Sequence, residues 1–303
     1  MVVNTTGPEG TAVDNQVEFT VAGVNVGSSN AGEEDEVNKS GDDYVSWNWK
    51  AGGAASSNTT GSLASSVSAN TAAGFSIVTY TGTGNDETVG HGLSEEPELV
   101  WVFRRTDAGY FKIISTTVGG LSFAKYFRTD DVGAAGTGNY WQNLNPGVTT
   151  AGTFTIVGAD NSTNGSSKDF VGYCWHSVEG YSKVGSYTSN NNADNAFVYT
   201  GFKPAWVMLK GDMAGNYTTF TIVDNKRDTY NPADVWLTAN SACQENYSSN
   251  TGGTCISRGD IDIADFVSNG FKIRSSSGEA GGGPATFIYL AFAESPFKYS
   301  NAR

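Results

Sequence analysis

Apolar and polar residues follow one another along short stretches of the chain in the period-2 pattern that is typical of β-strands. The clearest stretches are residues 170–175 (FVGYCW), 99–103 (LVWVF) and 205–209 (AWVML). Gly, Asn, Ser and Thr, which favour turns, separate them. A single helical turn could fit within residues 261–269 (IDIADFVSN), and little else has a helical period. The pattern therefore predicts an all-β fold of short antiparallel strands.

The same series of predicted strands occurs twice along the chain, and an internal repeat of this kind is a strong guide to the architecture of a fold. Tyr80 in the first copy aligns with Tyr187 in the second, and Pro97 aligns with Pro204. Further along, TFTIVGADNSTNGSSKDFVGYCW in the first copy matches GFKIRSSSGEAGGGPATFIYLAF in the second. Each copy is about 110 residues long, which is the size of a β-sandwich domain.

These repeats divide the chain into four segments. Residues 74–182 and 183–303 are predicted to be two tandem antiparallel β-sandwiches of the jelly-roll or lectin-like kind. Residues 1–50 match only the last part of the unit, so they are predicted to be a partial β domain or assembly segment whose strand edges need a partner. Residues 51–73, which are rich in Gly, Ser and Ala, are predicted to be a linker or an arm that extends onto a second copy.

Composition and charge narrow the classes of function. The net charge is −13, from 31 acidic and 18 basic residues, whereas nucleic-acid binding needs clustered Lys and Arg. No segment approaches the roughly 18 apolar residues of a membrane span, so membrane insertion is not expected. The first residues, MVVNTTGPEG, lack the pattern of a secretory signal. We therefore expect either a protein released by cell lysis or a processed fragment.

Several long stretches of the chain resemble a known type of domain. YVSWNWKAGG, TGFKPAWVMLK and FIYLAFAESPFKYSNAR together are similar to a tandem β domain of unknown function found in tail-fibre and virion structural proteins of marine phages. The resemblance runs from about Tyr44 to the end. It implies a virion or extracellular location and a non-enzymatic structural role, as a tail-fibre or capsid-associated fibre subunit. Such a subunit would bind copies of itself (as a trimer or polymer), other virion proteins and the host surface.

Two other functions fit the same fold. The chain could be an extracellular filament subunit that assembles by strand exchange through its N-terminal segment. It could also be a carbohydrate-binding or carbohydrate-active protein. The only histidines, His91 and His176, lack metal-ligand spacing, and no GxSxG motif is present. Paired carboxylates lie mostly in polar turns, so hydrolase activity is not expected, and neither is a cofactor.

Two groups of residues are candidates for binding. Tyr140 and Trp141 lie in a polar loop, GTGNYWQNLNPG, and could contact a surface or a glycan. Asp260, Asp262 and Asp265 form a short acidic cluster of the kind that supplies oxygen ligands to Ca²⁺. A solvated loop without a metal is the alternative for this cluster.

Two further pairs are candidates for structural roles. Cys243 and Cys255 flank a loop of small polar residues and could form a disulfide, whereas Cys174 lies within a predicted strand and should be a buried thiol. Asp224 and Arg227 follow an aromatic strand, and an ion pair between them would brace the turn.

Overall fold

The computed structural model describes most of the chain, and the fold that it shows is almost entirely β. The described residues are 17–20, 23–27, 38, 40–106, 112–115, 125–128, 149–158, 161–212, 219–239, 243–249, 255–259 and 261–296. Their helical content is α1 (Asn161–Asn164), which is one turn long. Within these ranges, no helix is long and apolar enough to cross a membrane. The predicted all-β class is thus confirmed.

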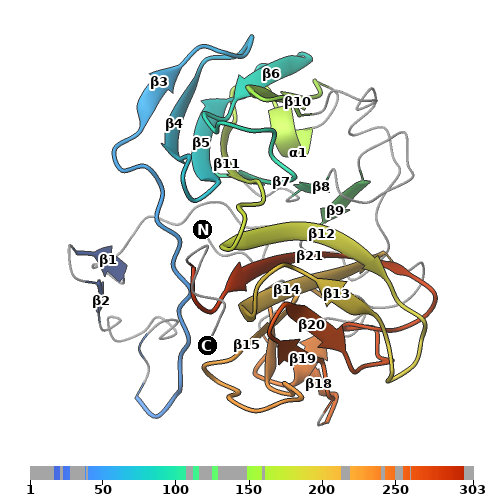
Figure 1. The fold of residues 1–303 in the computed structure, drawn as a ribbon. Coiled ribbons are helices and arrows are strands. Elements are labelled where there is room, and N and C mark those ends of the chain that lie inside the picture. The colour runs from blue at the N-terminus through green and yellow to red at the C-terminus, as the bar shows by residue number, and fades with distance from the viewer. Residues whose placement is uncertain are drawn as a thin grey trace.

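A seven-stranded antiparallel sheet forms the centre of residues 56–175, which we call the first half (Figure 1). In spatial order its strands are β3 (Ser56–Asn58), β4 (Ser65–Asn70), β5 (Phe75–Thr81), β11 (Asp169–Trp175), β7 (Leu99–Arg104), β8 (Lys112–Ser115) and β9 (Lys125–Arg128). A second sheet, made of β6 (Glu87–Gly90) and β10 (Thr153–Ile156), covers one of its faces.

A five-stranded antiparallel sheet forms the centre of residues 182–293, which we call the second half. In spatial order its strands are β12 (Ser182–Thr188), β21 (Thr286–Ala293), β14 (Pro204–Asp212), β15 (Thr221–Asp224) and β16 (Trp236–Thr238). A three-stranded sheet covers one face, in the order β13 (Phe197–Tyr199), β20 (Gly270–Ile273) and β19 (Ala264–Val267). Two hairpins complete the strands, β1 (Val17–Phe19) with β2 (Val24–Val26) and β17 (Tyr247–Ser249) with β18 (Cys255–Ser257).

The order of strand pairing is the same in the two halves. β11 lies between β5 and β7, and β21 lies in the same way between β12 and β14. Phe170 is opposite Tyr80 on the neighbouring strand, and Phe287 is opposite Tyr187 in the same way, so residues that align between the two copies pair alike. β6 pairs with β10, and β13 pairs with β20. The domain boundaries themselves, 74–182 and 183–303, stay a prediction.

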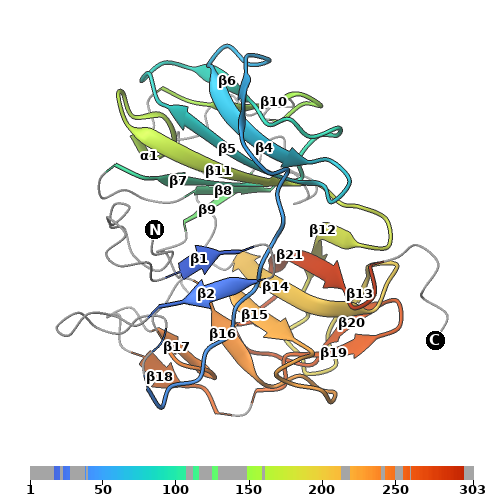
Figure 2. The same cartoon turned by 90° about the vertical axis from the view of Figure 1, so that its left-hand side faces the viewer.

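The sheets stack in layers, and the two large sheets face each other across an aromatic cluster (Figure 2). In β11, Phe170 and Cys174 point toward the β6–β10 sheet, while Trp175 points toward the second half. In β21, Phe287 and Phe292 point in opposite directions in the same manner. Central strands are therefore apolar on both faces, as strands covered on both sides must be.

The structure differs from the prediction of a linker or arm at residues 51–73. β3 and β4 lie within that range, and β4 pairs with β5 in the main sheet of the first half. Gly52 and Gly61 let the backbone pass against neighbouring strands, because a Cβ atom at either would stand 2.2 Å from a carbonyl oxygen. Small polar residues thus form strands here because the edge of β5 pairs with β4, and β4 in turn pairs with β3.

The segment before β3 runs along the second half (Figure 1). The Trp49 ring packs 5.3 Å from the Trp206 ring and 5.7 Å from the Phe292 ring, measured between centroids. Trp47 packs 6.3 Å from Trp206. The described part of the N-terminal segment therefore finds contacts within its own chain, on the aromatic face of the five-stranded sheet.

Candidate interaction surface

The outer face of the three-stranded sheet carries two exposed aromatic side chains. Along β13 the burial alternates, so that Val198 points into the core while Phe197 and Tyr199 are 50% and 66% exposed. Across the sheet, Phe197 is opposite Lys272 of β20, which is in turn opposite Asp265 of β19. Residues directly opposite share a face of the sheet. We call this surface the β13 face.

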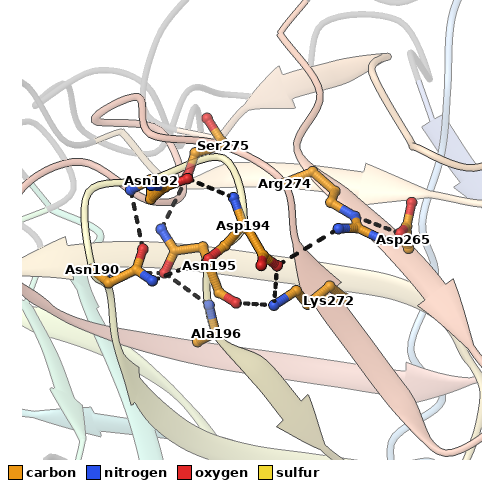
Figure 3. A network of polar contacts seen from close by, with 9 residues as sticks. All are labelled: Asn190, Asn192, Asp194, Asn195, Ala196, Asp265, Lys272, Arg274 and Ser275. Carbon is orange, nitrogen blue, oxygen red and sulfur yellow. Dashed lines mark hydrogen bonds and ion pairs between the residues drawn. The ribbon is translucent and has the colours of Figure 1, made fainter.

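An alternating row of charges borders the aromatic residues of the β13 face (Figure 3). Lys272 Nζ lies 2.8 Å from Asp194 Oδ1, and Arg274 Nε lies 2.6 Å from Asp265 Oδ2. Arg274 Nη1 also approaches Asp194 Oδ1, at 3.9 Å. The row contains two carboxylates and two cations, so its net charge is close to zero at neutral pH.

The loop that supplies Asp194 is built by asparagine side chains (Figure 3). Asn190 Nδ2 donates to the Asp194 carbonyl at 3.0 Å, and the Asp194 amide donates to Asn192 Oδ1 at 3.0 Å. Asn195 Nδ2 donates to the Ser275 carbonyl at 3.0 Å, which ties the loop to the end of β20. Asn side chains favour such local contacts with the backbone. The Asn-rich sequence SNNNADNA therefore specifies a fixed loop.

The position of Asp194 makes it an exposed but oriented anion. The hydrogen bond from Lys272 and the charges of Lys272 and Arg274 lower the pKa of the Asp194 carboxyl below its ordinary value. The side chain is 82% exposed. Aromatic rings beside oriented polar groups on a solvent-facing sheet suit the recognition of a protein edge or a sugar.

The predicted contact residues and calcium cluster lie only partly within the described residues. Tyr140, Trp141 and Asp260 lie outside them. Asp262 is exposed, and Asp265 is held by Arg274 in the ion pair of the β13 face. No group of three or more His, Cys, Asp or Glu that could hold a metal ion occurs in the described ranges.

The predicted pair of Asp224 and Arg227 is present at the turn after β15. Arg227 Nε donates to Asp224 Oδ2 at 2.7 Å, and the Arg227 amide donates to Oδ1 at 3.0 Å. Burial by itself would raise the pKa of Asp224, but the bonds from Arg227 and Lys226 outweigh it, and the pKa is lowered. The Arg227 guanidinium also lies 5.5 Å from the Trp47 ring centroid. The pair thus braces the turn and contacts the N-terminal segment.

The three cysteines take structural positions. Cys243 and Cys255 form a disulfide, with Cα atoms 5.4 Å apart. Cys174 is buried in the first half. Burial raises the pKa of its thiol to about 12, so the group stays protonated at neutral pH and is a poor nucleophile.

Both histidines are buried and bonded to the main chain. The Leu93 amide donates to His91 Nδ1 at 3.1 Å, so that Nε2 carries the proton toward the Thr150 carbonyl, 3.0 Å away. Burial lowers the pKa of His91, which keeps the ring neutral. His176 Nδ1 lies 2.9 Å from the Ser177 carbonyl. These contacts fix the turns that carry the two rings.

An open pocket of about 360 Å³ lies on the first half. Its lining is mostly small and polar, with Ser65, Thr79, Thr81, Arg105 and Asp169 among its residues. Asp169 Oδ1 already accepts a hydrogen bond from Thr81 at 2.8 Å. The pocket lacks an exposed aromatic ring, which distinguishes it from the β13 face.

Sequence reasoning missed the β13 face, although the two copies contain a signal for it. β13 pairs with β20 as β6 pairs with β10, which places Phe197 at the position of Thr88 and Tyr199 at that of Gly90. One copy thus has small residues where the other has aromatic ones. A position-by-position comparison of the repeats would have singled out this strand.

The fold and this surface define an all-β protein of stacked antiparallel sheets with an aromatic strand at an outer edge. The chain belongs to the family described as Domain of unknown function (DUF7483), whose model matches residues 1–296. No curated protein and no solved structure matches the chain.

Proposed function

We propose that the chain is a non-enzymatic structural protein of a phage virion, a tail-fibre or capsid-associated fibre subunit that self-assembles and contacts the host surface. The β13 face is the observation that supports this proposal most. It combines two exposed aromatic residues with oriented, mutually neutralised charges, which is the make-up of a recognition surface. Exposed aromatic side chains of this kind are enriched where proteins bind.

The state of the titratable groups supports a structural role. His91 is neutral and bonded to the main chain, and Cys174 is protonated. Asp224 and Asp265 are each held by an arginine. Groups held in this way stabilise turns and strands, whereas a catalytic acid or base must reach a substrate.

The second candidate function is carbohydrate binding. The exposed rings of Phe197 and Tyr199 suit stacking against a sugar ring, and the charged side chains around Lys272, which is opposite Phe197, suit bonding of its hydroxyl groups. In a phage fibre, such binding would serve the proposed contact with host-surface glycans. Filament assembly by strand exchange through the N-terminal segment has less support, because Trp47 and Trp49 pack within their own chain.

A glycan screen tests the non-enzymatic and adhesive parts of the proposal. The purified chain is applied to an array of bacterial surface polysaccharides, and the same polysaccharides are assayed in solution for new reducing ends. We expect binding to a subset without cleavage. Reducing ends whose release is abolished by Asp→Asn substitution of a single carboxylate would contradict the proposal and favour a hydrolase.

A further inference from the structure

Two of the described edges of the smaller sheets are covered by other segments of the chain, whereas no described strand covers the edge formed by β13. In the first half, the Leu63 amide donates to the Thr88 carbonyl of β6 at 3.0 Å. At the far edge of the three-stranded sheet, Asn231 bonds the backbone of Phe266 in both directions, at 2.9 and 3.0 Å. β13 is the other edge of that sheet, and no described strand pairs with its outer side.

The equivalent strands β6 and β13 differ at their outer edges. Another segment of the chain covers the edge of β6, whereas no described strand pairs with the edge of β13. On β6, Gly90 lies so close to the covering segment that a Cβ atom there would stand 2.2 Å from Asn58 Oδ1. On β13 the matching residue is Tyr199, which is 66% exposed. The chain therefore has a small residue where another of its segments covers the strand, and an aromatic residue where no described segment covers it.

The hydrogen-bond pattern shows which backbone groups of β13 face outward. The Ile273 amide donates to the Ala196 carbonyl at 2.9 Å, and the Thr200 amide donates to the Asn269 carbonyl at 3.0 Å. In an antiparallel pair, bonded residues alternate along the strand. Val198 therefore bonds toward β20, and the N–H and C=O groups of Phe197 and Tyr199 point to the open edge.

We propose that β13 pairs with β13 of a second copy of this chain, antiparallel about a twofold axis at Val198. The inference rests on the proposed self-assembling function and names the surface that would carry it. Phe197 of one copy then lies opposite Tyr199 of the other, and the pairing forms two bonded residue pairs. The two three-stranded sheets join into one continuous sheet, as edge strands do when they find a partner.

A second copy fits this edge better than an unrelated segment does. The strand is short and symmetric, with an aromatic residue on each side of Val198, so antiparallel self-pairing places an aromatic residue against an aromatic residue twice. The flanking Lys272 and Asp265 are neutralised by Asp194 and Arg274, so the join brings no unpaired charge together. Such a contact is isologous and builds a dimer; a closed trimer would need a different, heterologous contact.

Mixed cysteine cross-linking tests this register directly. Two versions of the full chain, Phe197→Cys and Tyr199→Cys, are co-expressed with different affinity tags and mildly oxidised. In the proposed pairing the Cα atoms of 197 and 199′ are about 5.5 Å apart, within disulfide range, whereas 197 and 197′ are about 8 Å apart. We therefore expect a cross-linked dimer in the mixture and little or none with either variant alone.

The native cysteines should not take part in the cross-linking, because Cys174 is buried and Cys243 is bonded to Cys255. Both substituted side chains are exposed, and far-UV circular dichroism checks that each variant folds. No cross-link in the mixture, or equal cross-linking of Phe197→Cys alone, would overturn the pairing.

A second measurement separates failure of this inference from failure of the proposed function. If the wild-type chain forms an oligomer whose mass is unchanged by Phe197→Lys with Tyr199→Lys, the edge pairing is wrong and self-assembly stands. A wild-type chain that stays monomeric and cleaves a polysaccharide would overturn both. An extended segment of another protein on β13 would likewise give no cross-link between copies.

Discussion

At the scale of single residues, two tyrosines show how closely the halves match. The Tyr80 ring stacks on Phe170 with centroids 5.2 Å apart, and the Tyr187 ring stacks on Phe287 at the same distance. Both tyrosines are buried in the core between a large and a small sheet. The alignment of Tyr80 with Tyr187 was predictable from the sequence. The stacking was not, because it depends on cross-strand register.

Removing the tyrosine hydroxyls should cost the two halves similar amounts of stability. Tyr80 donates to the Thr163 carbonyl at 2.7 Å, and Tyr187 donates to the Ala280 carbonyl at 2.5 Å. Tyr80→Phe and Tyr187→Phe should each lower the free energy of unfolding by about 1–2 kcal/mol, because a buried carbonyl loses its partner while the rings still stack. Urea titration checks this. A large loss for one variant and none for the other would contradict the equivalence.

At the scale of elements, the turn after β15 joins the N-terminal segment to the second half. Asp224 is 4% exposed and accepts bonds from the amides of Lys226 and Arg227 and from the Arg227 side chain. Arg227 also bonds Glu245 Oε1 through Nη1 at 2.6 Å. One carboxylate thus fixes the turn, and its arginine partner extends the contact to two other segments.

Stability should depend on the ionisation of Asp224. Because its pKa is lowered in the folded chain, the ionised carboxylate stabilises the fold above the ordinary pKa of 3.8, and this contribution is lost as pH falls through the lower, folded value. Asp224→Asn should destabilise the chain at pH 7 by about 2 kcal/mol. The difference in the free energy of unfolding between this variant and the wild type should become smaller below pH 3.8. Urea titrations at pH 7 and pH 3 measure this difference, and the same difference at both pH values would contradict the stabilising role of the Asp224 carboxylate.

Strand positions were largely predictable because alternation, aromatic residues and turn residues agree with one another. The prediction failed where pairing comes from distant parts of the chain. β4 (SSVSAN) has little apolar character, and it is a strand because β5 offers an edge. Residues 261–269 could have held a helical turn, but Ala264–Val267 forms β19 because it pairs with β20. The exposure of Phe197 was also hidden, since an aromatic residue in a strand is usually core.

At the scale of the whole molecule, aromatic packing between the two large sheets holds the halves together. Trp101 packs 5.4 Å from Trp175 within the first half and 6.0 Å from Phe220 of the second, measured between ring centroids. Aromatic pairs of this geometry add to the stabilisation from area burial. The two halves therefore pack together as one body. The β13 face lies in its outer layer, away from the aromatic contact between the two large sheets (Figure 2).

The mass of the purified chain in solution tests self-association through β13 most directly. Multi-angle light scattering over a range of concentrations should give an even multiple of the 31.9 kDa chain for the wild type. Phe197→Lys with Tyr199→Lys places like charges opposite each other across the twofold axis, and it should give 31.9 kDa. The control Tyr230→Lys, at a tyrosine that is 82% exposed beyond the other edge of the sheet, should keep the wild-type mass. A wild type that stays monomeric at every concentration, or a double variant with the wild-type mass, would contradict the account.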